Sequence, residues 1–473
     1  MGLGVVFTEP FFLFLFMPLS LVAILLTRGW GHSISILLFS LVFYYWDVGW
    51  AVFILVGSIL FNWYVGLWLE RARKRWILIF GILVNVAVLV FFKYALFGAG
   101  ILDRLANLDV SKHFQYIILP AGISFFTFES ISYLMDVWRK DTPAEKRLVV
   151  FGAWQSFYPH LIAGPIVRFR DVIQDFHKPK PSLDSAAAGA ARFGHGLLKK
   201  LLVADTVGLL ADACFAVPAA ELNPATAWLG AIAYALQIYF DFSAYSDMAI
   251  GIAMMCGIRL MENFQHPYSS STITEFWRRW HISLSTWFRD YLYIPLCGNR
   301  LGAMKTYRNL LIVFFVTGLW HGAAWTFIIW GLYHGGFLVL ERLVLKGNAN
   351  TITNWIPRFL YVLPVVIIGW VLFRAGSMTH AAQYLIAMFD PGRLGAAMPA
   401  SVEQVLTPWV AIVMMLGCLI FFAPRGPTIG ALTGTSGGWL SELAKTGYIA
   451  ACLLIAGVLA LASDFSPFLY FRF

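Results

Sequence analysis

Long apolar runs, separated by short polar loops, follow one another along almost the whole chain. A helix needs about 20 apolar residues to cross the hydrocarbon core of a bilayer, and runs of about that length recur throughout. The candidate spans are 10–27, 33–49, 50–69, 76–98, 114–137, 148–165, 195–216, 226–257, 308–345, 356–375, 405–423 and 446–463. Some of these segments are too polar, or too interrupted by helix-breaking residues, to be simple membrane-spanning helices. We therefore expect an all-α polytopic membrane protein with roughly ten to twelve membrane helices plus re-entrant and interfacial helices.

The charges in the first loops predict how the first five helices alternate. The loops at 70–75 and 139–147 are both rich in Lys and Arg, so both should face the cytoplasm. The loop around Asp47 has no basic residue, and the loop at 103–112 is balanced, so both are allowed outside. No Lys or Arg precedes the apolar run at 11–26. We expect a membrane helix there rather than a cleavable signal peptide, with the N-terminus outside.

Beyond residue 148 the pattern is less regular. Gly164 and Pro165 interrupt an apolar stretch, and such a pair breaks a helix. Non-helical backbone at membrane depth has to be covered by protein or water, so this segment should dip into the membrane rather than cross it. The polar stretch 177–192 is expected to be a cytoplasmic loop, and 376–404 a loop of moderate length. Nothing indicates a separate soluble domain.

Composition and charge exclude several classes of protein. The chain is 60% hydrophobic and 12% charged, whereas soluble domains carry about 25% charged residues. The net charge of +9 does not indicate nucleic-acid binding, because the basic residues lie in short loops between apolar runs. Five dispersed cysteines without a C-x-x-C pair give no metal or redox site. Motifs of metalloproteases, P-loop ATPases, serine hydrolases and dinucleotide enzymes are also missing.

The stretch 274–291 predicts an amphipathic, aromatic and basic helix. At 100° per residue, Arg278, His281, Ser285 and Arg289 fall within an arc of about 80°. Aromatic and aliphatic residues fall on the opposite side. Such a helix either lies flat at the headgroups or lines a cavity with its polar face, in which case His281 is a site residue.

A second histidine lies in the apolar stretch 311–332. No charged residue occurs within ten positions on either side of His321, and an isolated ionisable group at membrane depth is a candidate functional residue. Gly318 and Gly322 let another backbone approach closely, which leaves room for a substrate or a packed helix. His321 is either a general base or a structural histidine bonded to a carbonyl. For His334 we favour a structural role.

Two carboxylates lie in the apolar run 237–247. Asp241 and Asp247 need partners at that depth. They either pair with Arg168, Arg278 or Arg279 to hold the fold, or orient a catalytic histidine. A buried set of this kind, with two separated histidines, suits a transferase that removes a proton from a hydroxyl, or a transporter.

These motifs resemble the membrane-bound O-acyltransferase (MBOAT) family, and most closely its alginate O-acetylation branch, with the teichoic-acid D-alanyltransferases as cousins. The matching stretches are VFTEPFFLFLFMP (6–18), GISF (122–125), FESISY (128–133), HLIAGP (160–165), RFR (168–170), YFDFS (239–243), FWRRWHISLSTW (276–287), GLWHG (318–322) and PFLYFRF (467–473). The resemblance implies a single membrane domain over 1–473, with N-terminal helices at 1–147, a catalytic core at 148–345 and C-terminal helices at 346–473. Its fold would be a helical funnel that thins the membrane barrier.

The resemblance also implies a site and a reaction. The family's marker histidine matches His321, which would be the general base, and its second polar site position matches His281, which would assist. The binding or supporting residues expected around them are Trp320, Arg278, Ser285, Asp241, Tyr239 and Arg168. Oxyanion donors could come from Trp320, Trp280, Ser283 or a freed backbone N–H. Because no cysteine or serine adjoins His321, we prefer direct transfer to an acyl-enzyme.

The expected activity is O-acetyl transfer from a cytoplasmic donor for modification of an exopolysaccharide, with alginate as the first candidate. Acetyl-CoA is the expected donor substrate, and no bound cofactor or metal is expected. The expected partners are membrane lipid and a periplasmic or membrane-anchored SGNH-type acetyltransferase, in a bacterial inner membrane. The alternatives are D-alanyl transfer to teichoic acid, a proton-coupled transporter or flippase, and a scaffold that only recruits the periplasmic enzyme. An inverted repeat would favour a transporter, and we find none.

Overall fold

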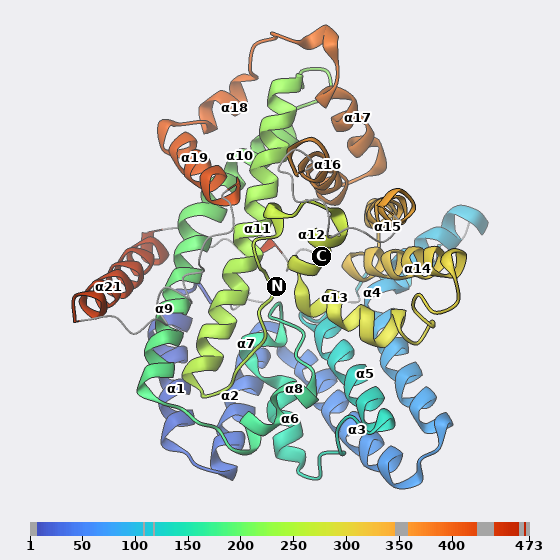
Figure 1. Cartoon of the computed structure of the whole chain (residues 1–473), viewed down its shortest axis with the longest axis vertical. Coiled ribbons are helices and arrows are strands. Elements are labelled where there is room, and N and C mark those ends of the chain that lie inside the picture. The colour runs from blue at the N-terminus through green and yellow to red at the C-terminus, as the bar shows by residue number, and fades with distance from the viewer. Residues whose placement is uncertain are drawn as a thin grey trace. The chain divides into compact units, whose positions relative to one another are not determined.

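The computed structural model describes residues 7–106, 109–116, 119–345, 358–422, 439–462 and 468–469, and within these ranges the chain forms helices and no strand (Figure 1). The all-α prediction is confirmed. The chain divides into two compact units. Unit 1 comprises 1–197, 245–262 and 433–472, and unit 2 comprises 198–244, 263–432 and residue 473. The C-terminal motif at 467–473 lies outside the described residues except for 468 and 469.

Unit 1 contains most of the N-terminal helices. They are α1 (Met17–Leu26), α2 (Trp30–Val48), α3 (Val52–Ala72), α4 (Arg75–Ala106), α5 (Ile123–Arg139), α6 (Leu148–Ser156), α7 (Tyr158–Leu161), α8 (Phe169–His177), α9 (Leu183–Leu198) and α21 (Trp439–Ala462). Most residues of α5 are buried, and α3, α4, α6 and α8 pack around it. Its polar residue Glu129 is 1% exposed, so it requires a partner inside the unit.

That partner lies in the segment where the sequence predicted a broken helix. α6 ends at Ser156, the short α7 ends at Leu161, and 162–168 is not helical but almost entirely buried. Nδ1 of His160 lies 3.0 Å from Oε1 of Glu129, and the same oxygen accepts a hydrogen bond from the Val167 N–H at 3.1 Å. The predicted break at Gly164 and Pro165 is confirmed. The surrounding protein buries the non-helical backbone, as is required of irregular backbone at membrane depth.

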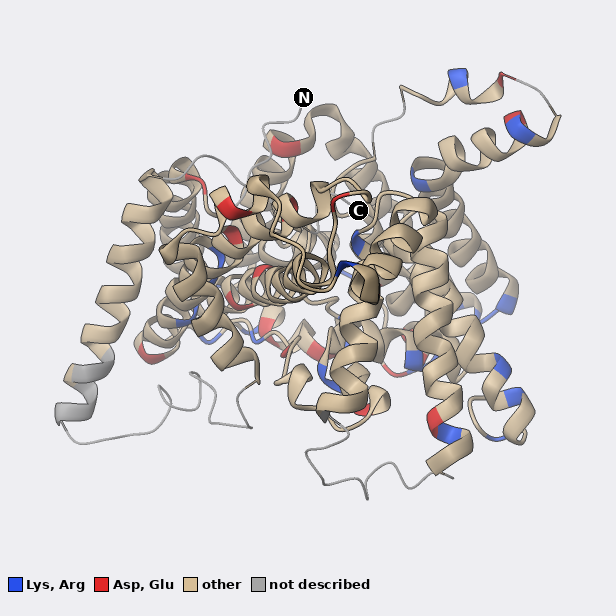
Figure 2. Ribbon diagram, turned by 90° about the horizontal axis from the view of Figure 1, so that it is seen from above, with Lys and Arg blue, Asp and Glu red and all other residues tan. Residues whose placement is uncertain are grey.

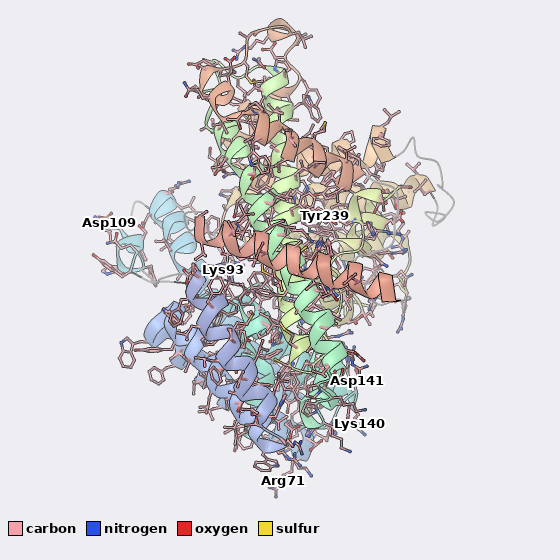
Figure 3. All side chains as sticks on the ribbon, turned by 90° about the vertical axis from the view of Figure 1, so that its left-hand side faces the viewer. Arg71, Lys93, Asp109, Lys140, Asp141 and Tyr239 are labelled. Carbon is pink, nitrogen blue, oxygen red and sulfur yellow. The ribbon has the colours of Figure 1, made fainter. Side chains whose placement is uncertain are left out.

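The two basic loops of unit 1 lie at the same end of that unit. Nη1 of Arg73 donates to the carbonyl of Val137 at 2.9 Å, and the Ala144 N–H donates to Glu70 at 2.9 Å. Figure 3 shows Arg71 and Lys140 at this end and Asp109 at the opposite end of unit 1. This is the alternation that the loop charges predicted for the first five helices.

Unit 2 contains the remaining helices. They are α10 (Asp205–Ala216), most of α11 (Pro224–Met255), α12 (Ile273–Arg279), α13 (Ile282–Phe288), α14 (Ala303–His321), α15 (Trp325–Leu345), α16 (Leu363–Arg374), α17 (Met378–Met388), α18 (Ala400–Val405) and α19 (Pro408–Phe422). α14 packs along α15, α15 packs on α12 and α16, and α10 packs on α18 and α19.

Several helices are long and apolar enough to cross a membrane. In the described part of the chain these are Trp30–Ala72, Arg75–Ala106 and Trp325–Leu345, with shorter apolar helices at Phe12–Leu26, Phe359–Arg374, Pro408–Phe422 and Thr446–Ala462. Figure 2 shows that charged positions are sparse over the ribbon as a whole. Together these features make the chain a multi-pass membrane protein. The total of ten to twelve crossings stays a prediction.

Three sequence predictions about local structure are wrong. Residues 183–192 belong to helix α9 rather than a loop, because a run of small residues follows the prolines and Gly189 packs directly on the Gly251 carbonyl of α11. The 376–404 stretch contains α17, whose start is capped by the Ser377 hydroxyl accepting from the His380 N–H. The candidate span 308–345 is two helices, α14 and α15, divided at Gly322.

A buried ion cluster joins the start of unit 2 to α11. Nζ of Lys200 donates to Asp205 at 2.6 Å and to Asp241 at 2.7 Å, and the Lys200 side chain is 2% exposed. Lys200 lies in a π-helical turn, Lys199–Ala204, between α9 and α10. The carboxylate of Asp241 is thereby neutralised inside an apolar helix, where an unpaired charge would be costly.

Candidate active site

His321 is the last residue of α14 and is 6% exposed. Its ring centroid lies 4.9 Å from that of Trp320, 5.0 Å from Trp330 and 5.1 Å from Phe373. The helix ends there because Gly322 is extended (φ −171°) and the chain turns into α15 at Trp325. The imidazole therefore sits in an aromatic cage at the carbonyl end of a helix.

Glycines hold α14 against α15 and so fix the position of His321. A Cβ on Gly331 would collide with the Phe314 carbonyl oxygen, and a Cβ on Gly318 would collide with the Phe327 carbonyl oxygen. Gly322 faces the Phe327 ring at similarly short range. Of the two possibilities left open by the sequence, the space beside Gly318 and Gly322 is filled by a packed helix. Its side chains Trp330 and Phe327 thereby come close to His321.

His281 lies at a sharp bend, and the prediction of one continuous helix over 274–291 is wrong. α12 ends at Arg279 and α13 begins at Ile282, while His281 adopts the left-handed conformation (φ 46°). The bend removes the single polar face, because His281 is fully buried while Arg278 and Arg289 are exposed. A left-handed backbone at a non-glycine residue is costly and is characteristic of functional sites.

Asn263 holds this bend in place, and the sequence analysis did not identify it. Its backbone carbonyl accepts from the Ile282 N–H at 2.9 Å, and its Oδ1 accepts from the Ser283 N–H at 3.2 Å and the Ser283 hydroxyl at 2.9 Å. Nδ1 of His281 lies 3.1 Å from the same Oδ1. Since Oδ1 accepts hydrogen bonds, Nδ1 of His281 must carry the proton, and Nε2 is the nitrogen with the lone pair.

Trp320 lies close to both histidines. Its ring centroid is 6.0 Å from that of His281 and 4.9 Å from that of His321. The structure thus brings three of the predicted site residues together, although 40 positions of sequence separate the two imidazoles. Trp330 and Phe373, which the sequence analysis did not name, also pack against His321. The indole N–H of Trp330 is buried and has no hydrogen-bond acceptor among the described residues, so it is available to a bound oxygen atom.

The other predicted site residues lie further from this cluster or serve another purpose. Arg278 is exposed, and the Ser285 hydroxyl donates to the Trp280 carbonyl at 3.4 Å. Tyr239, labelled in Figure 3, packs on Tyr268 and Trp280, with ring centroids 5.5 and 6.3 Å away. Arg168 belongs to unit 1, where its Nε donates to Asp171 at 2.6 Å.

The partners that we expected for the two carboxylates differ from those in the structure. Asp241 pairs with Lys200. Asp247 pairs at 2.9 Å with Arg192, which also contacts Glu262. The sequence analysis named Arg168, Arg278 and Arg279 as possible partners, and it named neither Lys200 nor Arg192. Arg192 lies in the 177–192 stretch that we expected to be a loop, and Lys200 lies in the candidate span 195–216, where we did not consider it as a partner.

The site contains groups for proton transfer but no group of metal ligands. No set of three or more His, Cys, Asp or Glu side chains that could hold a metal ion occurs in the described parts of the chain. A neutral imidazole at the C-terminal end of α14 can accept a proton, and the partial negative charge of that helix end favours the imidazolium. The surrounding indoles and phenyl rings exclude water, which strengthens such interactions.

The comparison with known families shows which class of reaction the protein catalyses. The profile of the membrane-bound O-acyltransferase family matches residues 80–378, which include α12 to α16 and both histidines. The chain belongs to this family. As an MBOAT protein it is an acyltransferase, and the resemblance seen in its motifs is confirmed. The matched region covers parts of both units and ends at the first residue of α17.

Individual MBOAT relatives match over different lengths. The chain is 43% identical to a Pseudomonas putida protein named "probable alginate O-acetylase AlgI", over 99% of this chain and 100% of that protein. It is 36% identical to the peptidoglycan O-acetyltransferase of Helicobacter pylori over 81% of this chain and 79% of that protein. The teichoic acid D-alanyltransferase of Bacillus subtilis is 28% identical over 55% of this chain and 69% of its own length.

Proposed function

We propose that this acyltransferase moves acetyl groups across the membrane for O-acetylation of an exopolysaccharide, with alginate as the first candidate polymer. The observation that carries the proposal is the pair of buried imidazoles, His281 and His321, both of which pack near Trp320. The full-length similarity to proteins named alginate O-acetylase supports acetyl as the group and alginate as the polymer. The donor that fits is acetyl-CoA, supplied from the cytoplasm.

In the proposed reaction His321 acts as the general base on an acceptor hydroxyl. The hydroxyl oxygen attacks the thioester carbonyl, the new C–O bond forms, and the C–S bond breaks to release the thiol. The proton taken by His321 returns to the departing sulfur. The free indole N–H of Trp330 beside His321 would donate to the developing oxyanion. His281, held as the Nδ1–H tautomer by Asn263, would position the donor or the acceptor through Nε2.

The proposed location is the bacterial inner membrane, with the N-terminus outside. It rests on the two basic loops that share one end of unit 1, since loops rich in Lys and Arg remain cytoplasmic. The proposed partner is a periplasmic or membrane-anchored SGNH-type acetyltransferase that passes the acetyl group to the polymer. Its hydroxyl, or that of the polymer, would be the acceptor.

Transfer of radiolabelled acetyl from acetyl-CoA by the purified protein in nanodiscs tests the proposal. We expect donor turnover that rises when the candidate periplasmic partner is added. Turnover of carrier-linked D-alanine instead would establish the teichoic-acid reaction. Partner binding without turnover of either donor would make the protein a scaffold, and proton-coupled movement of a solute without turnover would make it a transporter.

Asn263 should be needed for activity because it sets the tautomer and position of His281. Asn263→Leu removes the shared acceptor and is expected to lower acetyl transfer roughly 10- to 100-fold, as for other residues that orient a site imidazole. Asn263→Asp keeps an acceptor oxygen and should restore most of the rate. The measurement is the initial rate in nanodiscs at equal amounts of folded protein. If Asn263→Leu and wild type transfer acetyl at equal rates, the orientation of His281 by Asn263 does not contribute to catalysis. If the variant only lowers the amount of folded protein, the bend at His281 has a purely structural role.

A further inference from the structure

A groove on the outer face of the α14–α15 hairpin is distinct from the active site. Its volume is about 650 Å³, and it is lined by Met304, Lys305, Tyr307, Arg308, Leu311, Ile312, Phe315 and Leu332. All of these residues belong to unit 2. The lining is apolar along the helices and basic at the N-terminal end of α14. The surface of the groove itself is almost entirely apolar, so Lys305 and Arg308 line it with the apolar parts of their side chains and add two cations at its rim.

We propose that this groove binds one anionic phospholipid, with its phosphate at Lys305 and Arg308 and an acyl chain along Leu311, Phe315 and Leu332. The site goes beyond the proposed acetyl transfer and does not depend on it. The length of the groove fits a single leaflet. Met304 and Phe315 are eleven residues apart on α14, which is about 16 Å of helix. Half of the hydrocarbon core measures about 15 Å.

The cations at the basic end of the groove have no acidic partner among the residues that the structure describes. Arg300, Lys305 and Arg308 are exposed, and none of them forms an ion pair within the described parts of the chain. The acids nearest to them in the sequence and on the hairpin are already engaged. Asp290 accepts from Arg289 at 2.7 Å, and Glu341 accepts from the Ile273 and Thr274 backbone N–H groups. Lys305 and Arg308 at the groove, with Arg300 a few residues before them in the sequence, are uncompensated cations that attract an anionic headgroup.

Arg308 is oriented before any ligand arrives. Its Nη2 donates to Oδ1 of Asn309 at 3.0 Å. The Asn309 side chain is itself buried and fixed, because its Nδ2 donates to the carbonyls of Leu296 and Gly298 at 2.8 and 2.9 Å. A guanidinium held in this way loses little side-chain entropy when it binds a phosphate, and its fork-shaped geometry matches phosphate oxygens.

A glycine on α15 leaves open space near Leu332. Gly336 lies about one turn beyond Leu332 on α15, and the space where its Cβ would stand is open. Leu311, Phe315 and Leu332 are each more than a third exposed. An acyl chain covering them would stabilise the hairpin whose α14 ends at His321, since a ligand that binds only the folded state raises its stability.

Native mass spectrometry of the intact protein tests this site without measuring catalysis. The probes are dioleoylphosphatidylglycerol, dioleoylphosphatidylcholine with identical chains, and inorganic phosphate. We expect the anionic lipid to bind at least tenfold more tightly than the zwitterionic one. The variant Lys305→Gln/Arg308→Gln should weaken that binding by roughly tenfold to thirtyfold, and Leu311→Trp should weaken it by filling the groove. Arg71→Gln/Arg75→Gln, in a basic loop of unit 1, is the matched control and should bind like wild type.

Several results would overturn the proposal. If the two lipids bind equally tightly, the groove is an apolar surface with no preference for an anionic headgroup. If the control variant loses as much lipid affinity as Lys305→Gln/Arg308→Gln, the lipid responds to the general surface charge and not to this groove. Displacement of the lipid by inorganic phosphate alone would mean a simple anion site. If Lys305→Gln/Arg308→Gln and Leu311→Trp bind the lipid normally but fail to copurify with a partner helix, the groove is a protein interface. Leu311→Trp fills the groove and leaves every charge in place. It therefore tests the site independently if Lys305→Gln/Arg308→Gln folds poorly.

Discussion

Replacing His321 with alanine or phenylalanine is expected to lower acetyl transfer by roughly 10²- to 10⁴-fold, because the acceptor hydroxyl then has no base to take its proton. The protein should still accumulate in the membrane. The ring of His321 contacts Trp320, Trp330 and Phe373 edge to face, and phenylalanine retains those contacts. The rate of radiolabelled acetyl transfer per folded molecule is the quantity to measure.

His334 provides the matched control on the same hairpin. It is fully buried and also packs on Trp330, at a centroid distance of 5.3 Å. Neither of its ring nitrogens has a hydrogen-bond partner among the described residues, so a phenyl ring loses no hydrogen bond there. His334→Phe should therefore retain activity while His321→Phe loses it. Normal polymer acetylation by His321→Ala would exclude this residue from the chemistry, and equal losses in both phenylalanine variants would indicate packing of the aromatic cage instead.

The second large effect is expected at Gly331, where the two backbones of the hairpin meet. Gly331→Ala places a methyl group against the Phe314 carbonyl oxygen and the Gly318 backbone, and neither backbone can move without separating α14 from α15. Overpacking of this kind costs about 1–3 kcal/mol, which exceeds the gain of about 1 kcal/mol from replacing glycine in a helix. We expect a lower midpoint of thermal unfolding in detergent and a parallel loss of acetyl transfer.

Gly336→Ala isolates the cause of that loss. Gly336 lies on the same helix, but nothing stands within 4 Å of its would-be Cβ. The substitution there should raise the unfolding midpoint slightly, because only the helix-propensity gain remains. If Gly331→Ala were as stable as Gly336→Ala, close backbone packing would not be what holds His321 in position.

The sequence predicts helices well where hydropathy decides them and poorly where single contacts do. The long apolar runs give α2, α3 and α4, and Gly164–Pro165 gives the buried break after α7. His321 stands out because no charge lies near it in the sequence. The bend at His281 cannot be seen in the periodicity, because it depends on Asn263, eighteen residues earlier and with no regular spacing to it. Trp330 and Phe373 likewise reach the site only through helix packing.

The Lys200 cluster constrains how the chain can be inserted into a membrane during synthesis. Asp241 follows Lys200 by 41 residues, so the cation is already made when the long apolar helix α11 leaves the ribosome. On its own, that helix would bring a bare carboxylate into lipid. Its ionised aspartate is accommodated only when α11 meets the preceding turn, so the two segments have to leave the insertion machinery together rather than one at a time.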